Sequence, residues 1–371
     1  MSSLSRLRLT RFRSYLAAEL RFTGRIVAFT GPNGAGKTNL LEAISLLAPG
    51  RGLRGARISE VAMSGAPSWA VSGHFEDGLG GFEVGTGSLD EAGPERRAFR
   101  LDGEKLRSQA ELAERLAMVW LTPQMDRLFS EPPSGRRRFL DRLVLALEPS
   151  HARQVSAYET AMANRNRLLA EGRAEPAWLD ALEDAMARHG VAAAAARRAT
   201  VAKLSAALAE GVAGAFPAAR LTLQCPAADL LEAMPALAAE DALREGWASG
   251  RTRDAAAGAT LAGSHRADLL FTHAEKDVPA QLCSTGEQKA LLVSTVLAHA
   301  GMVGGQRGLA PLLLLDEVAA HLDAARRAAL LAALAVLPVQ SFLTGTEPES
   351  LPGMIENFRV ENGSVSPYPL P

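Results

Sequence analysis

The chain has 371 residues, of which 47% are hydrophobic, so it can bury a large core and form more than one lobe. Its formal net charge of -1 argues against a generally basic nucleic-acid coat but leaves room for a local basic face. The two cysteines are too few for a disulfide framework, and the longest apolar runs are too short to cross a bilayer. We therefore expect a cytoplasmic protein with no membrane partner.

Short alternating or apolar runs, separated by Gly and Asp, predict strands at 6–10, 25–30, 70–75, 81–84 and 97–101. From about residue 110, stretches rich in Ala, Leu, Glu and Arg have helical spacing, and they continue to about residue 250. The pattern then predicts a returning loop at 251–263, a buried strand at 312–315, a helix at 324–337 and a short strand at 341–343.

Strands and helices thus alternate at both ends of the chain around a helical insertion. We predict an α/β fold with two lobes. Lobe I, with a mixed sheet and helices, comprises residues 1–115 and 262–371, and the inserted helical lobe II comprises residues 116–261.

Residues 31–38 match the phosphate-binding pattern G-x-x-x-x-G-K-T between a predicted strand and a predicted helix. Its glycines allow backbone N–H groups to curl around phosphates, and the helix N-terminus adds partial positive charge. We expect Lys37 to neutralise the β- and γ-phosphates of ATP and Thr38 to ligate Mg²⁺. The predicted nucleotide-binding residues of the loop are Gly31, Pro32, Asn33, Gly34, Ala35, Gly36, Lys37 and Thr38.

An acidic pair, Asp316 and Glu317, follows the apolar run 312–315. Ligands of parallel sheets lie at the carboxyl ends of strands, so both carboxylates are expected near the bound phosphates. We predict that Asp316 reaches Mg²⁺ and that Glu317 orients or deprotonates the attacking water, with Lys37 as its catalytic partner. An Asp-Glu pair that merely opens a helix is the alternative interpretation.

A third segment, 284–289, reads Ser-Thr-Gly-Glu-Gln-Lys and precedes an apolar helix. Ser284 and Gly286 at a helix N-terminus can form an anion site. The same residues also fit an ordinary capping box, with Ser284 as N-cap and Glu287 three residues later.

The order of these segments, followed by Leu322 and Asp323, resembles the ABC ATPases and, among them, the heads of SMC-type DNA proteins. The resemblance implies that Ser284 and Gly286 bind the γ-phosphate held by the opposite subunit of an ATP-dependent homodimer, and that Asp323 lies in a loop across that interface. It also implies that Gln124 touches Mg²⁺ and couples the lobes, although a surface Gln after a turn is the plainer alternative.

Four further segments are similar to the RecF family of bacterial recombination proteins, and the similarity spans nearly the whole chain. These segments are 12–15, which would place Arg13 at the nucleotide, 133–141 (Pro-Ser-Gly-Arg-Arg-Arg-Phe-Leu-Asp), Tyr158 with 164–169, and 263–268 (Gly-Ser-His-Arg-Ala-Asp). Ser264 and Ala267 depart from the family pattern, and 344–346 (Thr-Gly-Thr) stand where transporters carry a switch His.

This resemblance implies a weak, DNA-stimulated ATPase that acts as a switch in DNA replication, repair and the SOS response. It implies binding to DNA junctions at single-strand gaps, with RecO, RecR and, indirectly, RecA as partners. Two clusters could touch the DNA backbone, namely Arg51, Arg54 and Arg57, and Arg136, Arg137 and Arg138. Such runs equally fit a solvated face or ion pairs. Aromatic residues make up only 5% of the chain, so base stacking is not indicated.

Two other functions remain open at this stage. An ATPase subunit of an ABC transporter shares the three motifs, although the arginine-rich element and the missing switch His argue against it. A module that binds ATP without hydrolysing it is the second, and the presence of Lys37, Asp316 and Glu317 argues against that one.

Overall fold

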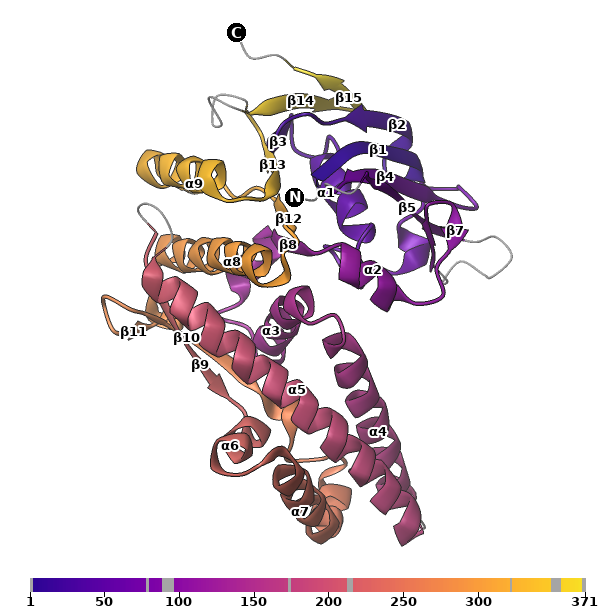
Figure 1. Cartoon of the computed structure of the whole chain (residues 1–371), viewed down its shortest axis with the longest axis vertical. Helices are drawn as coiled ribbons and strands as arrows, with labels where there is room; N and C mark the ends of the chain where they lie inside the picture. Colours follow the sequence, from indigo (N-terminus) through magenta and orange to yellow (C-terminus); the bar gives the residue numbers. More distant parts are fainter. Residues whose placement is uncertain are drawn as a thin grey trace. The chain divides into compact units, whose positions relative to one another are not determined.

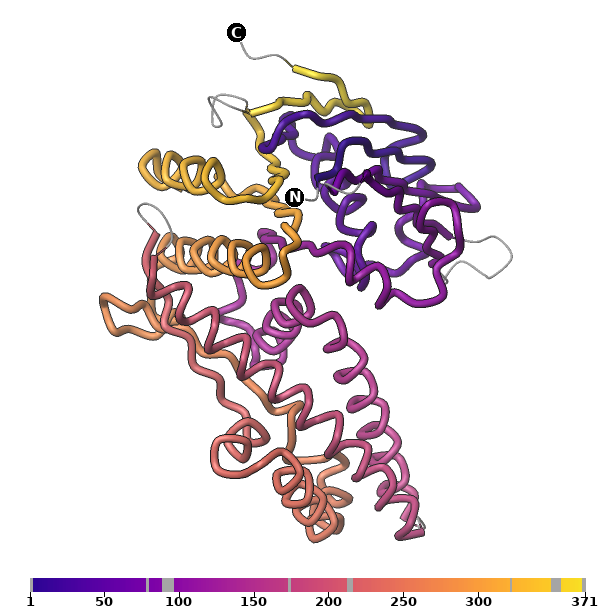
Figure 2. Tube along the Cα trace, in the orientation of Figure 1, coloured from indigo at the N-terminus to yellow at the C-terminus, as the bar shows by residue number. Residues whose placement is uncertain are grey.

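The computed structural model describes residues 3–77, 80–88, 97–172, 175–211, 216–320, 322–347 and 355–368. The chain divides into two compact units, which we describe separately (Figure 1). Unit 1 comprises residues 1–126, 210–218 and 284–371, and unit 2 comprises 127–209 and 219–283. Figure 2 shows the indigo N-terminal and yellow C-terminal segments running through the same unit, where β14 (Glu356–Glu361) pairs with β3 (Ile26–Thr30).

The limits of these units differ from those predicted for lobes I and II at both joins. Strand β8 (Met118–Leu121) pairs in parallel with β12 (Leu312–Leu315), so its residues belong to unit 1. Strand β10 (Asp268–His273) pairs with β9 (Ala219–Gln224) and belongs to unit 2. The backbone N–H and C=O groups of a short strand need hydrogen-bond partners in a sheet, but the sequence of the strand does not indicate which sheet provides them.

The first sheet of unit 1 has the order β15-β14-β3-β13-β12-β8. Every pair in it is parallel except β14 with β15. All residues of β3 and β12 are buried, as expected for a parallel sheet covered on both faces. The remaining strands are β3 (Ile26–Thr30), β13 (Gln340–Gly345), β14 (Glu356–Glu361) and β15 (Ser364–Pro367).

The second sheet is antiparallel, with the order β2-β1-β4-β5-β6-β7. Helix α1 (Lys37–Leu46) contacts β13 of the first sheet and β1 and β4 of the second, so its buried apolar residues join both sheets in one core. The strands are β1 (Ser3–Phe12), β2 (Tyr15–Arg21), β4 (Ala70–Glu76), β5 (Phe82–Ser88), β6 (Arg97–Leu101) and β7 (Glu104–Lys105). The other helices are η1 (Ile58–Glu60), α2 (Gln109–Arg115), η3 (Pro123–Arg127), α8 (Thr285–Arg307) and α9 (Ala324–Val336).

Unit 2 is mainly helical, but it also contains a three-stranded sheet of order β11-β10-β9. The strand β9 was not predicted, and the loop predicted at 251–263 was wrong over its first half, because α7 continues to Ala257. Glycine at 258, in the left-handed conformation, ends that helix. The remaining elements are α3 (Pro133–Leu147), α4 (His151–Glu171), α5 (Pro176–Glu210), α6 (Pro226–Ala233), α7 (Ala236–Ala257), η4 (Ser264–Arg266), β11 (Val278–Pro279) and η5 (Ala280–Leu282).

Two of the family-like segments meet inside unit 2. Arg165 is fully buried, and its guanidinium donates to Glu183, Asp254 and the Thr260 hydroxyl at 2.8–2.9 Å. The Tyr158 hydroxyl lies 2.7 Å from Nδ1 of His265, within the 263–268 element. A buried arginine with this many acceptors fixes the packing of the helices around it. Segments 158–169 and 263–268 therefore hold the fold of unit 2 together.

Candidate nucleotide-binding site

The loop between β3 and α1 has a backbone that requires glycine at two places. Gly31 has φ +152°, and a Cβ there would lie 2.1 Å from the carbonyl oxygen of Val360. Gly36 has φ +112°, and its Cβ would lie 2.8 Å from the Tyr15 hydroxyl. These are conformations that L side chains rarely adopt, and at both positions a side chain would collide with a neighbouring part of the protein, so the loop requires glycine there.

The turn at 12–15 supports this loop from the side. The Tyr15 hydroxyl donates to the carbonyl oxygen of Gly36 at 3.0 Å, and Nδ2 of Asn39 donates to Oγ of Ser14 at 3.0 Å. Burial raises the pKa of Tyr15, so the phenol stays a neutral donor. The family-like residues at 12–15 thus act on the phosphate-binding loop through its backbone and its helix.

Arg13 lies on the side of α1, where it meets Glu42. Its Nη2 and Nε donate to the two Glu42 carboxylate oxygens at 2.6 and 2.9 Å, and Arg54 donates to the same carboxylate at 2.7 Å. Glu42 is only 2% exposed, so two cations balance one buried anion. Direct contact of Arg13 with nucleotide remains a prediction, and Arg54 is engaged by a carboxylate.

Lys37 is buried and folds back on its own loop. Its ammonium donates to the carbonyl oxygens of Gly31 and Pro32 at 2.7 and 2.9 Å. Burial lowers the pKa of Lys37, while the nearby Glu317 and Asp316 carboxylates act in the opposite direction. The ammonium therefore lies against the loop, and its contact with the β- and γ-phosphates remains a prediction.

Four functional segments reach the same edge of the first sheet, because β3, β13, β12 and β8 are parallel neighbours. The phosphate-binding loop follows β3, and Asp316 follows β12 with its N–H donating to the Leu121 carbonyl of β8 at 2.9 Å. The Thr38 hydroxyl donates to Oδ1 of Asp316 at 2.9 Å. Gln124 lies beyond β8 in η3, where it is exposed. The structure thus brings Thr38 and Asp316 together, and their binding of Mg²⁺ remains a prediction.

Thr344, at the end of β13, links the two acidic residues. Its hydroxyl donates to Oδ1 of Asp316 at 2.8 Å and accepts from the N–H of Glu317 at 2.8 Å. Glu317 has φ +49°, an uncommon backbone conformation that this contact helps to hold. The sequence pattern gave residues 344–346 no role, because only the order of β12 and β13 in the sheet places Thr344 beside Asp316.

Replacing Thr344 by Val should lower ATP turnover by roughly 10- to 100-fold, since a hydrogen bond to a charged group is worth about 1.5–3 kcal/mol. Burial raises the pKa of Asp316, and the Thr344 and Thr38 hydroxyls oppose that rise. Losing one hydroxyl should raise the pKa further and move the acid limb of the pH–rate profile to higher pH. Thr344→Ser should restore both values, and an unchanged pH profile in Thr344→Val would contradict the assignment.

Ser284 is the N-cap of α8 and completes a capping box. Its Oγ accepts from the N–H of Glu287 at 3.4 Å, and the Glu287 carboxylate accepts from the N–H of Ser284 at 2.9 Å. Ser284 nevertheless remains exposed. Asp323 likewise caps α9 by accepting from the N–H of Arg326 at 2.8 Å. Both residues thus shape helix N-termini on unit 1, and their action on a partner's nucleotide remains a prediction.

Lys289 connects three parts of the site and was not predicted. This buried side chain donates to the Ala320 carbonyl at 2.7 Å and lies 3.7 Å from the Asp126 carboxylate. It thereby joins the helix of Ser284 to the loop after Glu317 and to η3, which carries Gln124. A cation buried among acceptors from both segments holds them in one arrangement.

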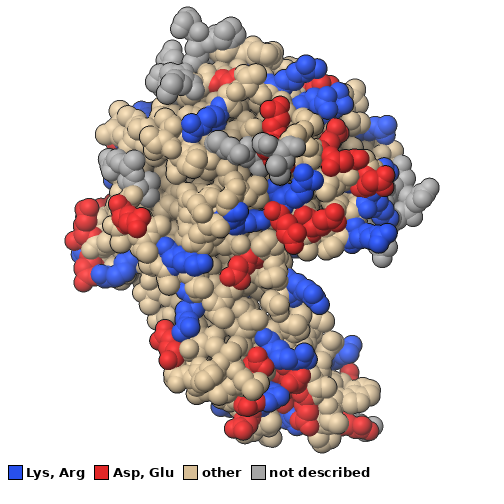
Figure 3. All heavy atoms as spheres, in the orientation of Figure 1, with Lys and Arg blue, Asp and Glu red and all other residues tan. Residues whose placement is uncertain are grey.

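In each predicted basic cluster one arginine is paired with a carboxylate, Arg54 with Glu42 and Arg136 with Asp268. Figure 3 shows both signs of charge intermixed on the face in view. Arg136 donates to both oxygens of Asp268 at 2.7 Å, and Arg137 donates to the Ala267 carbonyl at 3.5 Å. Arg138, Arg51 and Arg57 are exposed. We therefore assign Arg136 to the fold of unit 2 and not to DNA binding, because its guanidinium already forms a two-bond ion pair with a carboxylate and would have to break it to bind a phosphate.

Arg136→Ala should destabilise the protein by about 3 kcal/mol, because it leaves the Asp268 carboxylate, 11% exposed, without its cation. Arg138→Ala, on the same helix but exposed, should stay within about 0.5 kcal/mol. Urea unfolding of both variants checks the difference. A stable Arg136→Ala protein with a reduced salt dependence of DNA binding would restore the DNA-contact interpretation.

The site combines a glycine loop between a strand and a helix, carboxylates after a neighbouring parallel strand, and the capped helix α8. Together these features define an ABC-type P-loop ATPase. Residues 3–364 match the family model described as RecF/RecN/SMC N terminal domain. A protein of Mesorhizobium japonicum named DNA replication and repair protein RecF is 48% identical over 370 residues, covering 98% of this chain and 97% of the relative. Its namesake in Agrobacterium fabrum is 50% identical over 371 residues, covering 98% of each. This chain belongs to the RecF family.

Solved structures agree on the fold. A structure of the recombination mediator protein RecF with ATP superposes with a TM-score of 0.86 at 23% identity, covering 99% of this chain and 98% of that one. The Smc head domain of Pyrococcus furiosus gives 0.54 at 16% identity, covering 99% and 96%. The predicted ABC-ATPase head fold is therefore confirmed. Among the described residues, no helix combines the length and apolarity needed to span a membrane.

Proposed function

We propose that this protein is an ATP-driven DNA-binding switch of recombinational repair and replication restart in the cytoplasm. The observation that carries the proposal is the linked set Thr38–Asp316–Thr344–Glu317 beside the phosphate-binding loop. Thr38 and Asp316 would be the ligands of a metal, and Glu317, which joins the set through its backbone N–H, would supply the base. A module that binds ATP without hydrolysing it would not need the base to be positioned.

The residues fit Mg²⁺, because Thr38 and Asp316 place a hydroxyl and a carboxylate oxygen 2.9 Å apart, and hard oxygen ligands suit this ion. Bound Mg²⁺ would supply charge neutralisation at the phosphates. In our proposal the Lys37 ammonium leaves the carbonyls of Gly31 and Pro32 and binds the β- and γ-phosphates. Glu317 accepts a proton from the attacking water. Gln124 reaches the same edge once nucleotide is present.

ATP in this scheme closes a homodimer. Ser284, Gly286 and Asp323 lie at the N-termini of α8 and α9, and the partial positive charge of a helix N-terminus suits the γ-phosphate held by a second copy. Closure is a population shift that requires ATP to bind the dimer more tightly than the monomer. Slow, DNA-stimulated hydrolysis would then reopen the dimer.

DNA is the partner proposed for the closed dimer, since the relatives are named for DNA replication and repair. We propose gapped or junction DNA as the target, RecO and RecR as partners, and RecA loading with the SOS response as the consequence. Arg51, Arg57 and Arg138 are the exposed members of the two clusters that suit backbone contacts.

Sedimentation of the full chain with ADP, with ATP and with gapped duplex tests the proposal. We expect a monomer with ADP, a dimer with ATP, and a dimer that co-sediments with gapped DNA with ATP. A monomer under every condition would overturn the switch, and ATP-dependent dimers that ignore DNA would overturn the partner. Co-purification with a membrane protein would instead favour the transporter alternative.

A further inference from the structure

Two of the three arginines in the loop after α1 line a hollow whose described lining includes no residue of the phosphate-binding loop. Gly50 and Gly52 have φ +101° and +70°, and a Cβ on Gly52 would lie 2.7 Å from Cδ2 of Leu46. Arg54 in this loop pairs with Glu42, as described above. Arg51 and Arg57 instead line a hollow of about 450 Å³ together with Arg97 of β6 and Gln109 at the start of α2.

Arg97 is the unusual member of this hollow. Its Nη2 donates to the Ala48 carbonyl at 3.3 Å, and its guanidinium carbon lies 4.3 Å from the centre of the Phe99 ring. Its Nη1 is buried and has no hydrogen-bond partner among the described residues. Burial lowers the pKa of Arg97 to about 10. An unsatisfied buried guanidinium nitrogen costs free energy that an anion would recover.

The rest of the lining supplies further donors. Oε1 of Gln109 accepts from the N–H of Gly50 at 3.2 Å, so the Gln109 amide has its Nε2 left to donate. The described lining residues include no carboxylate, since the others are Gly50, Ala56 and Ile58. Three guanidinium groups without a counter-ion in the lining make this hollow an oxyanion site by its chemistry.

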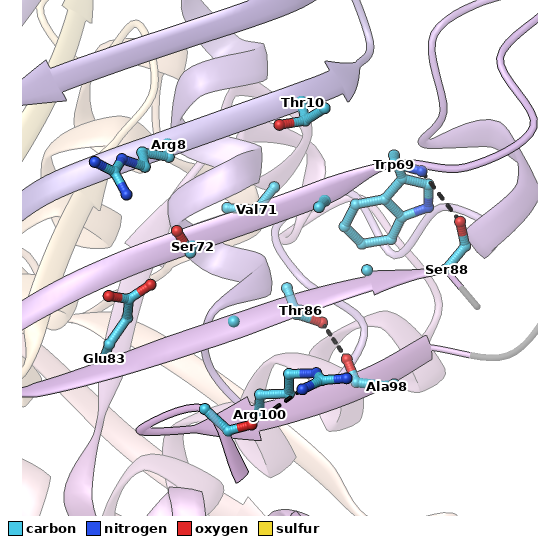
Figure 4. Close-up of a pocket in the computed structure, with 14 residues that line it drawn as sticks. Arg8, Thr10, Trp69, Val71, Ser72, Glu83, Thr86, Ser88, Ala98 and Arg100 are labelled. Atoms are coloured by element: carbon cyan, nitrogen blue, oxygen red, sulfur yellow. Dashed lines mark hydrogen bonds between the residues drawn. The ribbon is translucent and has the colours of Figure 1, made fainter. Parts of the chain in front are cut away.

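A second hollow in the same unit serves as a contrast. It lies on the outer face of the antiparallel sheet, encloses about 390 Å³, and has Arg8, Glu83 and Arg100 among its lining residues (Figure 4). There Arg8 pairs with Glu19, Glu83 with Arg6, and Arg100 donates to the Gly103 carbonyl. Arg8 and Glu83 there are each paired with an opposite charge, and Glu83 itself is part of the lining, whereas the described lining of the hollow at Arg97 has no acidic residue.

We propose that Arg51, Arg57 and Arg97, with Gln109, form a second phosphate-binding site in unit 1, separate from the phosphate-binding loop, and that it takes a backbone phosphate of DNA. The oxyanion chemistry stands on the lining alone, whereas the choice of DNA as its source rests on the proposed function. Planar guanidinium groups match the paired oxygens of a phosphate, and contacts of this kind position DNA without reading its sequence.

The test uses the full-length double variant Arg51→Gln with Arg57→Gln. Arg97 is left unchanged, because replacing it also removes its packing against Phe99. Arg21→Gln is the matched control, since this exposed arginine lies in β2 and outside the hollow. DNA affinity is measured by fluorescence anisotropy of a labelled gapped duplex with ATP over a series of salt concentrations. We expect weaker binding by the double variant and a log–log salt slope smaller by about two units, one per lost phosphate contact. Arg51→Lys with Arg57→Lys should retain most of the slope.

A second measurement separates DNA from free phosphate. The rise in Tm caused by inorganic phosphate is compared between the wild type and the double variant, which share the same phosphate-binding loop. A smaller rise in the variant, together with the weaker DNA binding, supports the site as proposed. If the double variant binds DNA with the same affinity and salt slope as the wild type, the assignment of the site to DNA is overturned. If inorganic phosphate raises the Tm of both proteins equally, the oxyanion site itself is overturned. If the wild type itself does not bind DNA, it is the proposed function that fails.

Discussion

Glu317→Gln is expected to leave ATP binding near normal while lowering turnover by at least about 100-fold, as for loss of a general base. The substitution conserves shape, so the N–H of residue 317 can still donate to the Thr344 hydroxyl, and Asp316 keeps its bonds to Thr38 and Thr344. What is removed is the carboxylate that accepts the proton of the attacking water. The variant should therefore accumulate as a closed dimer with ATP.

Two measurements check this result. Direct nucleotide titration should give an affinity for ATP close to that of the wild type, and a turnover assay should show the loss. Asp316→Asn is the informative companion, because it alters the residue proposed to hold Mg²⁺ and should weaken the Mg²⁺-dependent part of ATP binding. If Glu317→Gln turned over ATP at the wild-type rate, another residue would have to be the base.

The sequence was most informative where chemistry requires a local pattern. Residues 31–38 predict their own backbone, because glycines at these positions between a strand and a helix permit the positive-φ conformations that a phosphate-binding loop adopts. The apolar run 312–315 followed by Asp316 similarly predicts a buried parallel strand and the edge at which its ligand lies. These local patterns gave the approach of Thr38 to Asp316, although the two residues are 278 positions apart.

Contacts between distant residues that carry no local pattern could not be predicted. Arg136 looked like a candidate for DNA, because nothing near it in sequence identifies Asp268, 132 residues later, as its partner. Thr344 is an ordinary strand residue until the order of β12 and β13 places it beside Asp316. The limits of the two units could not be predicted for the same reason, since the pairing of β8 and β10 depends on which sheet accepts them.

The second large effect that we expect comes from replacing Ser284 by Arg, and this variant separates the two interpretations of the residue. The structure already contains the capping box, so loss of the cap should cost roughly 1 kcal/mol of stability whatever else Ser284 does. If capping were its sole role, the folded variant would dimerise with ATP and hydrolyse it normally. If Ser284 faces the γ-phosphate of a second copy, the bulky Arg should block closure, and both dimerisation and turnover should be lost. ATP binding by the monomer through Lys37 and Thr38 should survive.

Ser284→Asp sharpens this test, because Asp is as good an N-cap as Ser but brings a negative charge to the phosphate. It should therefore retain stability and still fail to dimerise. Mixing Ser284→Arg with Lys37→Met adds a geometric check. In the mixed dimer, one composite site combines the intact loop of the first chain with the intact Ser284 of the second, while the other site carries both changes. Partial recovery of turnover on mixing is expected if each site is shared between subunits. A folded Ser284→Arg protein that dimerises with ATP and turns over at the wild-type rate would exclude shared sites, and with them the closure on DNA that we propose.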